Sequence, residues 1–359
     1  ANKYRFIEAA AESYYTSPYV SNFDTYSYKF SKNLSNTISL VFDKKTFKLD
    51  AGFRHQLINL GTDRVLPTAV GVVIPTENKE NRLGAVGNLE IKLWDKVDVK
   101  SFLEYSNGKS FGNYLRSENL LKLEPIKGYI LDAHVNFQSA IPSFNYLINP
   151  SFYQDFNYNF SNAQNQSITE IGGKINLKWF DSSVFANYFR IDNFAYFGTD
   201  FLPKQSSETV NISQIGGEAT LKYWKLNFNT KLLFQSALSQ KELLPMPNFV
   251  GRLNVFYQSK AFKNAAEIQT GFKVYYFSKF KSRDYFPVLN EFVLSNSGTS
   301  IGGQPIADAY FNMKVKRMMI FAEAQHFNTT FMKNKSFTAP NYPIYDFRLN
   351  LGIVWYIFH

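Results

Sequence analysis

Hydrophobic and polar residues alternate along most of this chain. Phe47, Leu49, Ala51 and Phe53 are separated by the polar or small residues Lys48, Asp50, Gly52 and Arg54. The final segment, from Tyr345, keeps the same alternation as far as Trp355 and Ile357. Successive side chains of a β-strand point to opposite faces, so these segments predict strands with one apolar and one polar face.

The same alternation predicts strands along the rest of the chain. Two are expected at 19–30 and 36–42, and others follow at 88–93, 97–104, 111–122, 129–138, 226–235, 252–258, 267–276 and 307–315. Two similar segments, I-G-G-K-I-N-L-K-W-F-D from Ile171 and I-G-G-E-A-T-L-K-Y-W-K from Ile215, lie 44 residues apart and suggest a repeated hairpin unit. The chain is therefore expected to be all-β.

The connections between these segments alternate between short and long. Short turns are expected at 43–45, 94–96, 181–183, 224–225, 260–264 and 316–317, and longer connections at 60–82, 141–166, 198–207, 239–247, 281–305 and 331–344. Short periplasmic turns and long extracellular loops are typical of transmembrane antiparallel β-barrels. We expect a single barrel over residues 18–359 with about sixteen strands, fourteen and eighteen being the alternatives. Residues 1–17 are a lead-in or an extra strand, and a soluble β-sandwich is the competing fold.

Composition narrows the class of protein. The chain is 45% hydrophobic, yet its mean hydropathy is −0.26 and no run approaches eighteen apolar residues, which excludes transmembrane helices. The absence of Cys excludes disulfides, thiol catalysis and Cys-ligated metals. The net charge of +10 is spread singly along the strands, which favours a polar lining or an anionic membrane surface over nucleic acid.

The predicted polar face carries slightly more bases than acids, and rings of basic side chains favour anions. The alternative interpretation is that these charges pair across neighbouring strands and stiffen the wall. The candidate pore-lining residues are Lys48, Arg54, Lys100, Asp132, Lys174, Lys178, Lys222, Lys231, Arg252, Lys273, Asp308, Lys314, Glu323 and Arg348.

The long connection 281–305 is the candidate constriction. Its apolar residues Phe286, Val288, Leu289, Phe292 and Val293 favour packing in the barrel mouth, although they could equally extend a strand above the membrane. Folding into the mouth would bring Lys281, Arg283 and Asp284 close to Lys273 and add charge to the opening.

Catalytic chemistry is not indicated. Asp132 with His134, and Asp308 or Glu323 with His326, are acid–histidine pairs, but no motif marks a nucleophile beside them. No phosphate-binding motif or metal-ligand spacing stands out. We expect no enzyme activity, no cofactor and no metal, with these side chains serving as lumen polar groups.

The end of the chain resembles the terminal insertion signal of bacterial outer-membrane barrels. In such a signal a polar residue, a glycine and two large apolar residues are read by the assembly machinery, and here Asn350, Gly352, Trp355 and Ile357 hold these places. Phe358 and His359 follow, where many such proteins end on the aromatic residue itself.

Three longer segments resemble the putative-porin family of the Bacteroidota outer membrane. They are Q-S-A-I-P-S-F-N-Y from Gln138, P-I-A-D-A-Y-F-N-M-K-V-K-R-M-M-I-F-A-E-A-Q-H-F-N from Pro305, and N-Y-P-I-Y-D-F-R-L-N-L-G-I-V-W-Y-I-F from Asn341. The resemblance implies an outer-membrane barrel and passive transport.

The leading functional hypothesis is a porin-like channel for small hydrophilic solutes with a mild anion preference. The alternative is an accessory or structural barrel, plugged by its own loops and docked to a secretion or uptake complex. Expected partners are outer-membrane lipid and lipopolysaccharide, the barrel-assembly machinery during insertion, and a homo-oligomer or larger envelope complex. No nucleic acid is expected.

Overall fold

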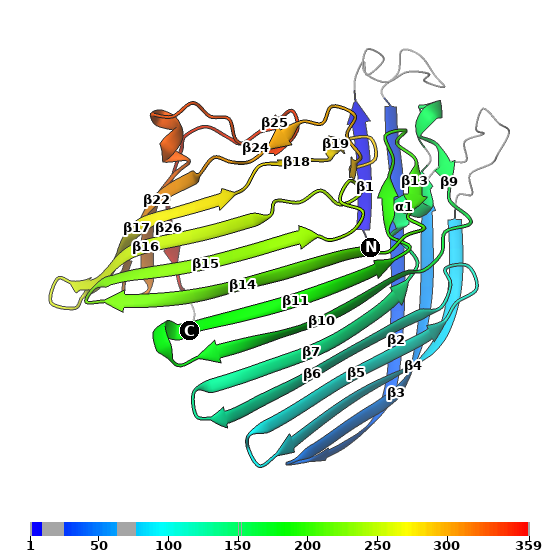
Figure 1. Cartoon of the computed structure of the whole chain (residues 1–359), viewed down its shortest axis with the longest axis horizontal. Coiled ribbons are helices and arrows are strands. Elements are labelled where there is room, and N and C mark those ends of the chain that lie inside the picture. The colour runs from blue at the N-terminus through cyan, green and yellow to red at the C-terminus, as the bar shows by residue number, and fades with distance from the viewer. Residues whose placement is uncertain (1, 9–24, 63–76, 150, 152, 358–359) are drawn as a thin grey trace.

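A single antiparallel sheet of sixteen strands forms the body of the protein (Figure 1). The computed structural model describes residues 2–8, 25–62, 77–149, 151 and 153–357. The expected boundary between residues 17 and 18, and the start of the strand expected at 19–30, lie outside the described residues. In sheet order the strands are β1 (Asn2–Glu8), β2 (Thr25–Lys44), β3 (Phe47–Thr62), β4 (Glu77–Leu93), β5 (Val97–Asn107), β6 (Tyr114–Ile126), β7 (Tyr129–Ala140), β10 (Gln166–Leu177), β11 (Ser182–Asp192), β14 (Val210–Tyr223), β15 (Leu226–Ala237), β16 (Phe249–Ala261), β17 (Ala266–Phe277), β22 (Ile306–Val315), β23 (Met318–Gln325) and β26 (Arg348–Trp355).

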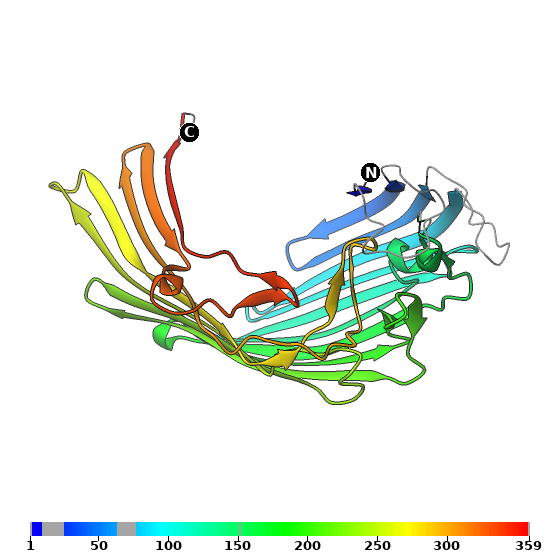
Figure 2. The same cartoon turned by 90° about the horizontal axis from the view of Figure 1, so that it is seen from above.

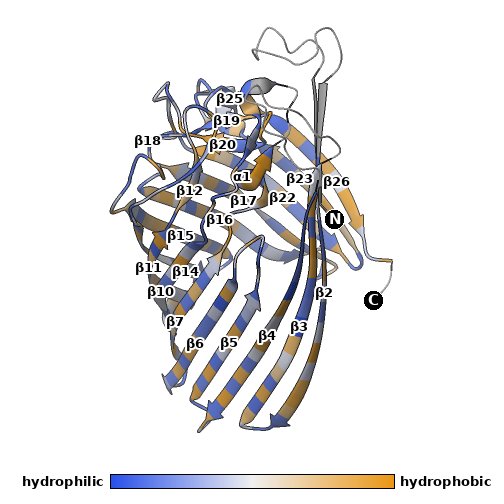
Figure 3. Ribbon diagram, turned by 90° about the vertical axis from the view of Figure 1, so that its right-hand side faces the viewer, coloured by the Kyte–Doolittle hydropathy of each residue, from blue (hydrophilic) through white to orange (hydrophobic). Residues whose placement is uncertain are grey.

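The alternating pattern of the sequence gives this sheet one polar and one apolar face. Hydrophilic and hydrophobic residues alternate along the strands in Figure 3. Members of the apolar set, such as Ile38, Phe53, Leu103 and Leu351, remain largely exposed on the convex face. In a β-sandwich these side chains would be buried against a second sheet, so the exposed apolar face favours a membrane-facing wall.

Two predictions about the first strands were wrong. The long connection expected at 60–82 is shorter, because β3 continues to Thr62 and β4 begins at Glu77. The two strands expected at 19–30 and 36–42 are one long strand, β2, because residues between them pair with β3 without a break, from Ser31 opposite Leu60 to Ser35 opposite Gln56. The intervening sequence contains neither Gly nor Pro, so nothing interrupts the ladder.

The sheet is curved into a trough (Figure 2). Its edge strands, β1 and β26, lie at opposite lips, and among the described residues they do not pair with each other. Short turns gather at one rim of the wall and long connections at the other (Figure 1). The alternation expected from the sequence is therefore present, while a closed barrel is not formed by the described residues.

The long connections contain structure of their own, which we call the cap: residues 141–165, 193–209 and 281–305, without 150 and 152. Its centre is a four-stranded sheet with the order β13-β12-β20-β19, in which β12 and β20 are parallel. The cap elements are α1 (Phe144–Leu147), β8 (Ile148–Asn149), η2 (Gln154–Phe156), β9 (Tyr158–Asn159), β12 (Ala195–Phe197), β13 (Pro203–Gln205), β18 (Phe280–Lys281), β19 (Asp284–Phe286), β20 (Glu291–Val293) and β21 (Ser300–Ile301).

The remaining short elements lie in turns and in the last long connection. They are η3 (Trp179–Asp181), η4 (Phe327–Thr330), β24 (Phe337–Ala339) and β25 (Tyr342–Pro343). No helix within the described residues has the length and apolar character needed to cross a membrane.

Candidate functional site

The concave face of the trough is the candidate site, because polar and charged side chains converge there from many strands. Arg54 on β3 reaches past β4 and donates to Glu104 on β5, with Nη1 and Oε1 2.5 Å apart. In the register of β3 with β4, Gly84 lies opposite Arg54. An ion pair that skips one strand ties three strands together and holds the wall locally rigid.

A second group of charges lies further along the same face. Glu218 accepts from the ammonium of Lys174 at 3.1 Å and lies 3.7 Å from that of Lys231. Lys273 lies 3.4 Å from Glu323 and 4.7 Å from the centre of the Tyr310 ring. These lining bases are therefore largely compensated, so cross-strand pairing of the lumen charges, one of the two expectations, is present at these positions.

A hollow of about 620 Å³ lies on the concave face where β4, β5, β6, β7 and β10 run side by side. Three carboxylates open into it, from Glu90, Glu118 and Glu170, and Phe102 adds an aromatic surface. Its remaining lining is Asn88, Leu89, Lys100, Ser101, Asn119, Leu120, His134 and Asn136. This composition suits a hydrated polar solute, with several hydrogen-bond acceptors beside one ring.

The histidines do not form the acid–histidine pairs considered from the sequence. His134 Nε2 lies 3.2 Å from Glu170 rather than beside Asp132, whose carboxylate accepts from Asn176 at 3.2 Å. The backbone N–H of His326 donates to the Asp308 carboxylate at 2.9 Å, while the ring Nδ1 of His326 lies 2.6 Å from the carbonyl oxygen of Tyr345.

Strand register aligns several other predicted lining residues across neighbouring strands, while Lys178 lies outside the strands. Register sets Lys273 opposite Asp308, Lys231 opposite Arg252, and Lys174 opposite Asp132. Three further residues have local partners: Lys48 lies 3.7 Å from Asp43, Arg252 donates to Asn229 at 2.8 Å, and Arg348 stacks on Tyr345 at 4.2 Å. Lys100 lines the hollow, Lys222 and Lys314 lie on β14 and β22, and Lys178 lies in a short turn beside η3.

The residues of the expected constriction pack into the cap. Val288, Leu289 and Val293 are almost fully buried, and they pack with Tyr153, Phe156, Tyr158 and Phe197 from the other two cap segments. Of the two alternatives for these apolar residues, a packed loop is the one observed. Phe292 departs from this pattern because it stays exposed.

The three charged residues of that segment have different surroundings. Lys281 is exposed on β18, whereas Arg283 donates to the carbonyl oxygen of Leu243 and stacks on Phe194 at 5.6 Å. Burial lowers the pKa of the Arg283 guanidinium. One carboxylate oxygen of Asp284 is buried without a hydrogen-bond partner among the described residues. Arg283 is thus tied to the loop 238–248, while Lys273 is tied to the wall.

The cap covers the concave face at the long-loop end, where inward positions of the wall become apolar. Ile58 and Leu60 of β3 pack with Phe111, Phe144 and Leu147. In the same way Ile191 and Ile212 of β11 and β14 pack with Leu244 and Met246 of loop 238–248. The cap is therefore seated on the wall by hydrophobic contacts rather than extended above it.

A buried polar group joins the cap to β2. Lys29 is almost fully buried, and its ammonium has no hydrogen-bond partner among the described residues, although Glu291 of β20 is close enough to interact electrostatically. Asn145 donates to Glu291 at 2.7 Å and accepts from the Tyr158 hydroxyl. Burial raises the pKa of Tyr146 to about 12 and that of Tyr158 well above its usual range, and Glu291 adds to both.

Sequence reasoning missed this group, because Lys29 and Glu291 lie far apart in the chain. It also missed Glu80 and Arg82, whose side chains are 3.3 Å apart and buried. Arg82 donates to the carbonyl oxygens of Phe111 and Gly112 at 2.9 and 2.8 Å, and Glu80 accepts from the Phe111 N–H at 2.6 Å. The available signal was their spacing: two opposite charges two residues apart share one face of a strand.

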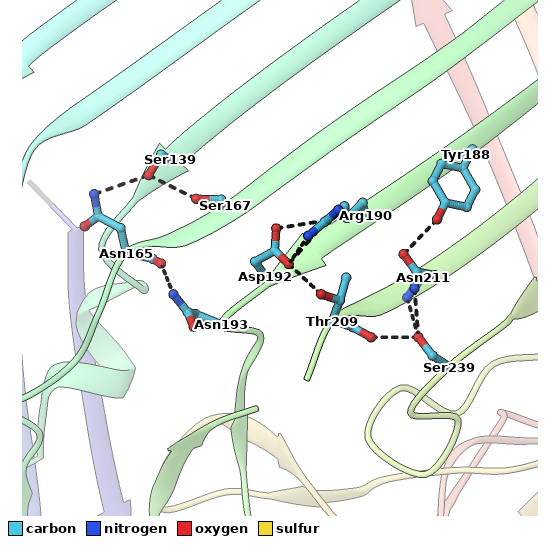
Figure 4. Close-up of polar contacts among 10 residues, drawn as sticks. All are labelled: Ser139, Asn165, Ser167, Tyr188, Arg190, Asp192, Asn193, Thr209, Asn211 and Ser239. Carbon is cyan, nitrogen blue, oxygen red and sulfur yellow. Dashed lines mark hydrogen bonds and ion pairs between the residues drawn. The ribbon is translucent and has the colours of Figure 1, made fainter. Parts of the chain in front are cut away.

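A polar ladder crosses the outer face near the long-loop ends of β7, β10, β11, β14 and β15 (Figure 4). Asp192 accepts from Arg190 at 3.2 Å and from Thr209 at 2.6 Å. Tyr188 donates to Asn211 at 2.8 Å, and Ser239 continues the ladder. Because the apolar outward residues lie on the short-turn side of it, the ladder marks where the hydrophobic band of the wall ends.

The terminal segment keeps the predicted faces. Asn350 lies opposite Glu323 and Gly352 opposite Phe321 on the concave side, while Trp355 is exposed on the convex side. Strand β26 ends at Trp355, so Ile357 lies beyond it and is exposed.

Solved structures with a similar fold include an iron transporter, a siderophore receptor and a ferric enterobactin receptor. The FrpB iron transporter from Neisseria meningitidis (F5-1 variant) matches with a TM-score of 0.66 and 13% identity over 98% of this chain and 60% of that chain. The siderophore receptor PirA from Acinetobacter baumannii matches with a TM-score of 0.65 and 9% identity over 92% and 55%. The ferric enterobactin receptor PfeA of Pseudomonas aeruginosa matches with a TM-score of 0.62 and 13% identity over 89% of this chain and 51% of that chain. The chain thus spans between half and three-fifths of the length of these receptors, and at such identities the likeness shows the fold alone.

A search of curated proteins finds no match to this chain. A family model described as "Putative porin" matches residues 1–359. The match spans every strand of the wall and all three cap segments, and on that basis the chain belongs to the putative porin family.

Proposed function

We propose that this protein is an outer-membrane channel through which small hydrophilic solutes diffuse passively, with a mild preference for anions. The observation that carries the proposal is the two-faced wall: polar and charged groups line its concave side, and exposed apolar groups cover its convex side. A hydrated lumen inside a lipid-facing wall requires this arrangement. We place the protein in the outer membrane of a Bacteroidota cell, in contact with its lipid and lipopolysaccharide.

The proposal requires the wall to close. Backbone N–H and C=O groups at the free edges of β1 and β26 would lack partners in hydrocarbon, and each unpaired group costs several kcal/mol. We propose that the native wall is a closed barrel of about sixteen strands or more, in which both edges are paired. Its insertion would depend on the barrel-assembly machinery, with Asn350, Gly352, Trp355 and Ile357 as the signal.

A second candidate is a barrel that the cap holds shut. The buried core of the cap and its seat on β2 and β3 favour this candidate, and so does the likeness of the fold to iron receptors. Such a barrel would act as a receptor that opens on demand, or as an accessory barrel docked to a secretion or uptake complex. Neither candidate involves catalysis, and we propose that the protein is not an enzyme.

Planar-bilayer conductance tests the channel proposal. Purified protein that gives a heat-modifiable band after detergent extraction from the outer membrane is added to the bilayer. Stable ohmic steps support an open channel. Silence from the native chain, together with steps from a variant whose cap is loosened, would favour the capped barrel instead, and silence from both would rule out a pore.

The anion preference is tested by the permeability ratio at low salt, where screening is weakest. Lys281→Glu is expected to lower the anion-to-cation ratio, because this exposed ammonium lies in the cap segment 281–305. Lys241→Glu, in the loop 238–248, is the matched control with the same change of charge. Equal ratios in the native and Lys281→Glu proteins would remove this segment from the selectivity filter.

A further inference from the structure

The short-turn rim carries a concentration of positive charge. Seven turns join neighbouring wall strands there, at 45–46, 94–96, 127–128, 178–181, 224–225, 262–265 and 316–317. Each turn contains at least one base, while the acids within them are Asp95 and Asp181. The eight bases are Lys45, Lys96, Lys127, Lys178, Lys225, Lys263, Lys316 and Arg317. Eight bases against two acids leave a net charge of six, more than half of the formal +10 of the chain.

This charge is not neutralised by the protein. Within the described part of the chain, none of the ion pairs includes a base of these turns. In the lumen, by contrast, Arg54, Lys174, Lys231 and Lys273 all have carboxylate partners. The rim therefore offers free positive charge to a partner outside the chain.

Aromatic rings accompany the bases. All four tryptophans of the sequence lie at this rim: Trp94, Trp179 and Trp224 in the turns, and Trp355 opposite Met318 beside the turn 316–317. The Lys225 ammonium lies 5.1 Å from the Trp224 ring centre. Tryptophan favours the boundary between hydrocarbon and lipid headgroups, because its ring is apolar and its N–H is polar.

The backbone of the turns gives an independent indication. Trp94, Phe180 and Trp224 have φ values of 51°, 56° and 54°, in the left-handed region that Gly or Asn would occupy at lower cost. Packing within the protein does not account for these choices, because the exposed fractions of Trp94 and Trp224 are 82% and 78%. Large rings in strained and exposed positions indicate contact with something other than the protein.

We propose that the short-turn rim is a collar that binds anionic phospholipid headgroups. The ammonium and guanidinium groups of the turns bind phosphate oxygens of these lipids, and the neighbouring rings lie among the glycerol groups and upper acyl chains. Charge complementarity selects anionic over zwitterionic phospholipid, because a zwitterionic headgroup already neutralises its own phosphate. The inference rests on the membrane insertion proposed above but not on transport.

Intrinsic fluorescence provides the test, because every tryptophan lies at this rim. The full chain is reconstituted into vesicles of phosphatidylethanolamine with a minority of phosphatidylglycerol, and either lipid is brominated in turn to quench tryptophan. Brominated phosphatidylglycerol is expected to quench severalfold more than its share of the bilayer predicts. A contribution of about 1 kcal/mol per base near an anionic surface corresponds to about fivefold enrichment.

A variant and a matched control locate the effect. Lys96→Gln, Lys178→Gln, Lys225→Gln and Arg317→Gln together remove one base beside each tryptophan and should bring quenching down to the bulk share. The control removes four bases of the opposite rim, Lys109→Gln, Lys241→Gln, Lys279→Gln and Lys335→Gln, and should keep the preference.

Three results would overturn the collar. Quenching of the native chain by each brominated lipid in proportion to its share of the bilayer would show that neither lipid is selected. This measurement does not depend on the folding of any variant. A preference that survives the loss of the four bases beside the tryptophans, or that the control variant also loses, would place its origin elsewhere. Lack of quenching by both lipids would overturn membrane insertion itself, and with it the proposed function.

Discussion

Two glycines of β4 differ in what surrounds them. A Cβ atom on Gly84 would overlap the carbonyl oxygen of Tyr105 and lie 2.9 Å from the Cα of Ser106, whereas the nearest atom to a Cβ on Gly87 would be 3.8 Å away. At the scale of single residues, the close approach of neighbouring groups therefore requires a glycine at position 84. At position 87 there is room for a side-chain methyl group.

We therefore expect Gly84→Ala to lower the free energy of unfolding by about 1–3 kcal/mol, the usual cost of overpacking. Gly87→Ala should change it by less than about 1 kcal/mol, in the stabilising direction, because the unfolded chain loses freedom. Urea unfolding in lipid vesicles measures both. Equal effects at the two positions would contradict the observed packing.

The buried tyrosines make the cap sensitive to alkaline pH. The pKa of Tyr146 is raised to about 12, so the ionised form is disfavoured while the cap is seated. This contribution to stability is complete below pH of about 10, the ordinary tyrosine value, and is lost as the pH rises towards 12.

Cap release should accordingly appear between these values, as faster proteolysis of the cap with a parallel rise in tyrosinate absorbance. Tyr146→Phe should move the release to higher pH, since Tyr158 remains buried and protonated. Tyr223→Phe, at the exposed short-turn rim, should leave the profile unchanged. If Tyr146→Phe leaves the pH of cap release unchanged, the transition belongs to other titrating groups.

At the scale of elements, the cap contains one parallel strand pair, in which Phe197 of β12 lies opposite Val293 of β20. Phe197 is fully buried, while Phe292 on the same small sheet is 45% exposed. The two phenylalanines therefore contribute very differently to the seating of the cap.

Phe197→Ala should destabilise the cap by about 3–5 kcal/mol, the range for a buried phenylalanine. We expect larger or longer conductance steps and faster proteolysis of residues 193–209, with the wall still heat-modifiable. Phe292→Ala is the control and should resemble the native chain. Unchanged conductance in a Phe197→Ala protein whose cap is cleaved would mean that the cap does not limit the channel.

At the scale of the whole molecule, the convex face should tolerate no charge. Ile215 is exposed on the convex side near the middle of β14, and its neighbour Gln214 lies on the concave side, where it donates to Gln235 at 3.0 Å. Ile215→Arg should cost about 2–4 kcal/mol in a bilayer. Gln214→Arg should cost much less, and similar losses for both in urea titrations would contradict a lipid-facing convex surface.

The wall was predictable because its two faces meet different surroundings, so that apolar and polar residues alternate along each strand. Prediction weakened on β6, where the inward Leu120 lines the hollow and breaks the alternation. The Arg54–Glu104 pair could not be predicted either, since it joins β3 to β5 across β4 and the alternation within each strand does not indicate such a partner.

The cap was not predictable in the same way. Its strands are three residues or fewer, too short to show a period, and they meet across segments about a hundred residues apart. The apolar residues of 281–305 indicated that this segment packs, but nothing in the sequence identified β12, Lys29 or the Tyr158–Asn145–Glu291 contacts as its partners.

The order of the wall strands makes its width modular. Each wall strand pairs with the strands before and after it along the wall, and Ile171 and Ile215 begin the same I-G-G sequence on β10 and β14. Joining residue 170 directly to residue 215 would therefore remove two strands, and every remaining side chain of the wall would stay on the same face of the sheet. Duplicating the same unit would add two, so the width of the wall can be changed by recombination between copies of one hairpin, without redesign of the remaining strands.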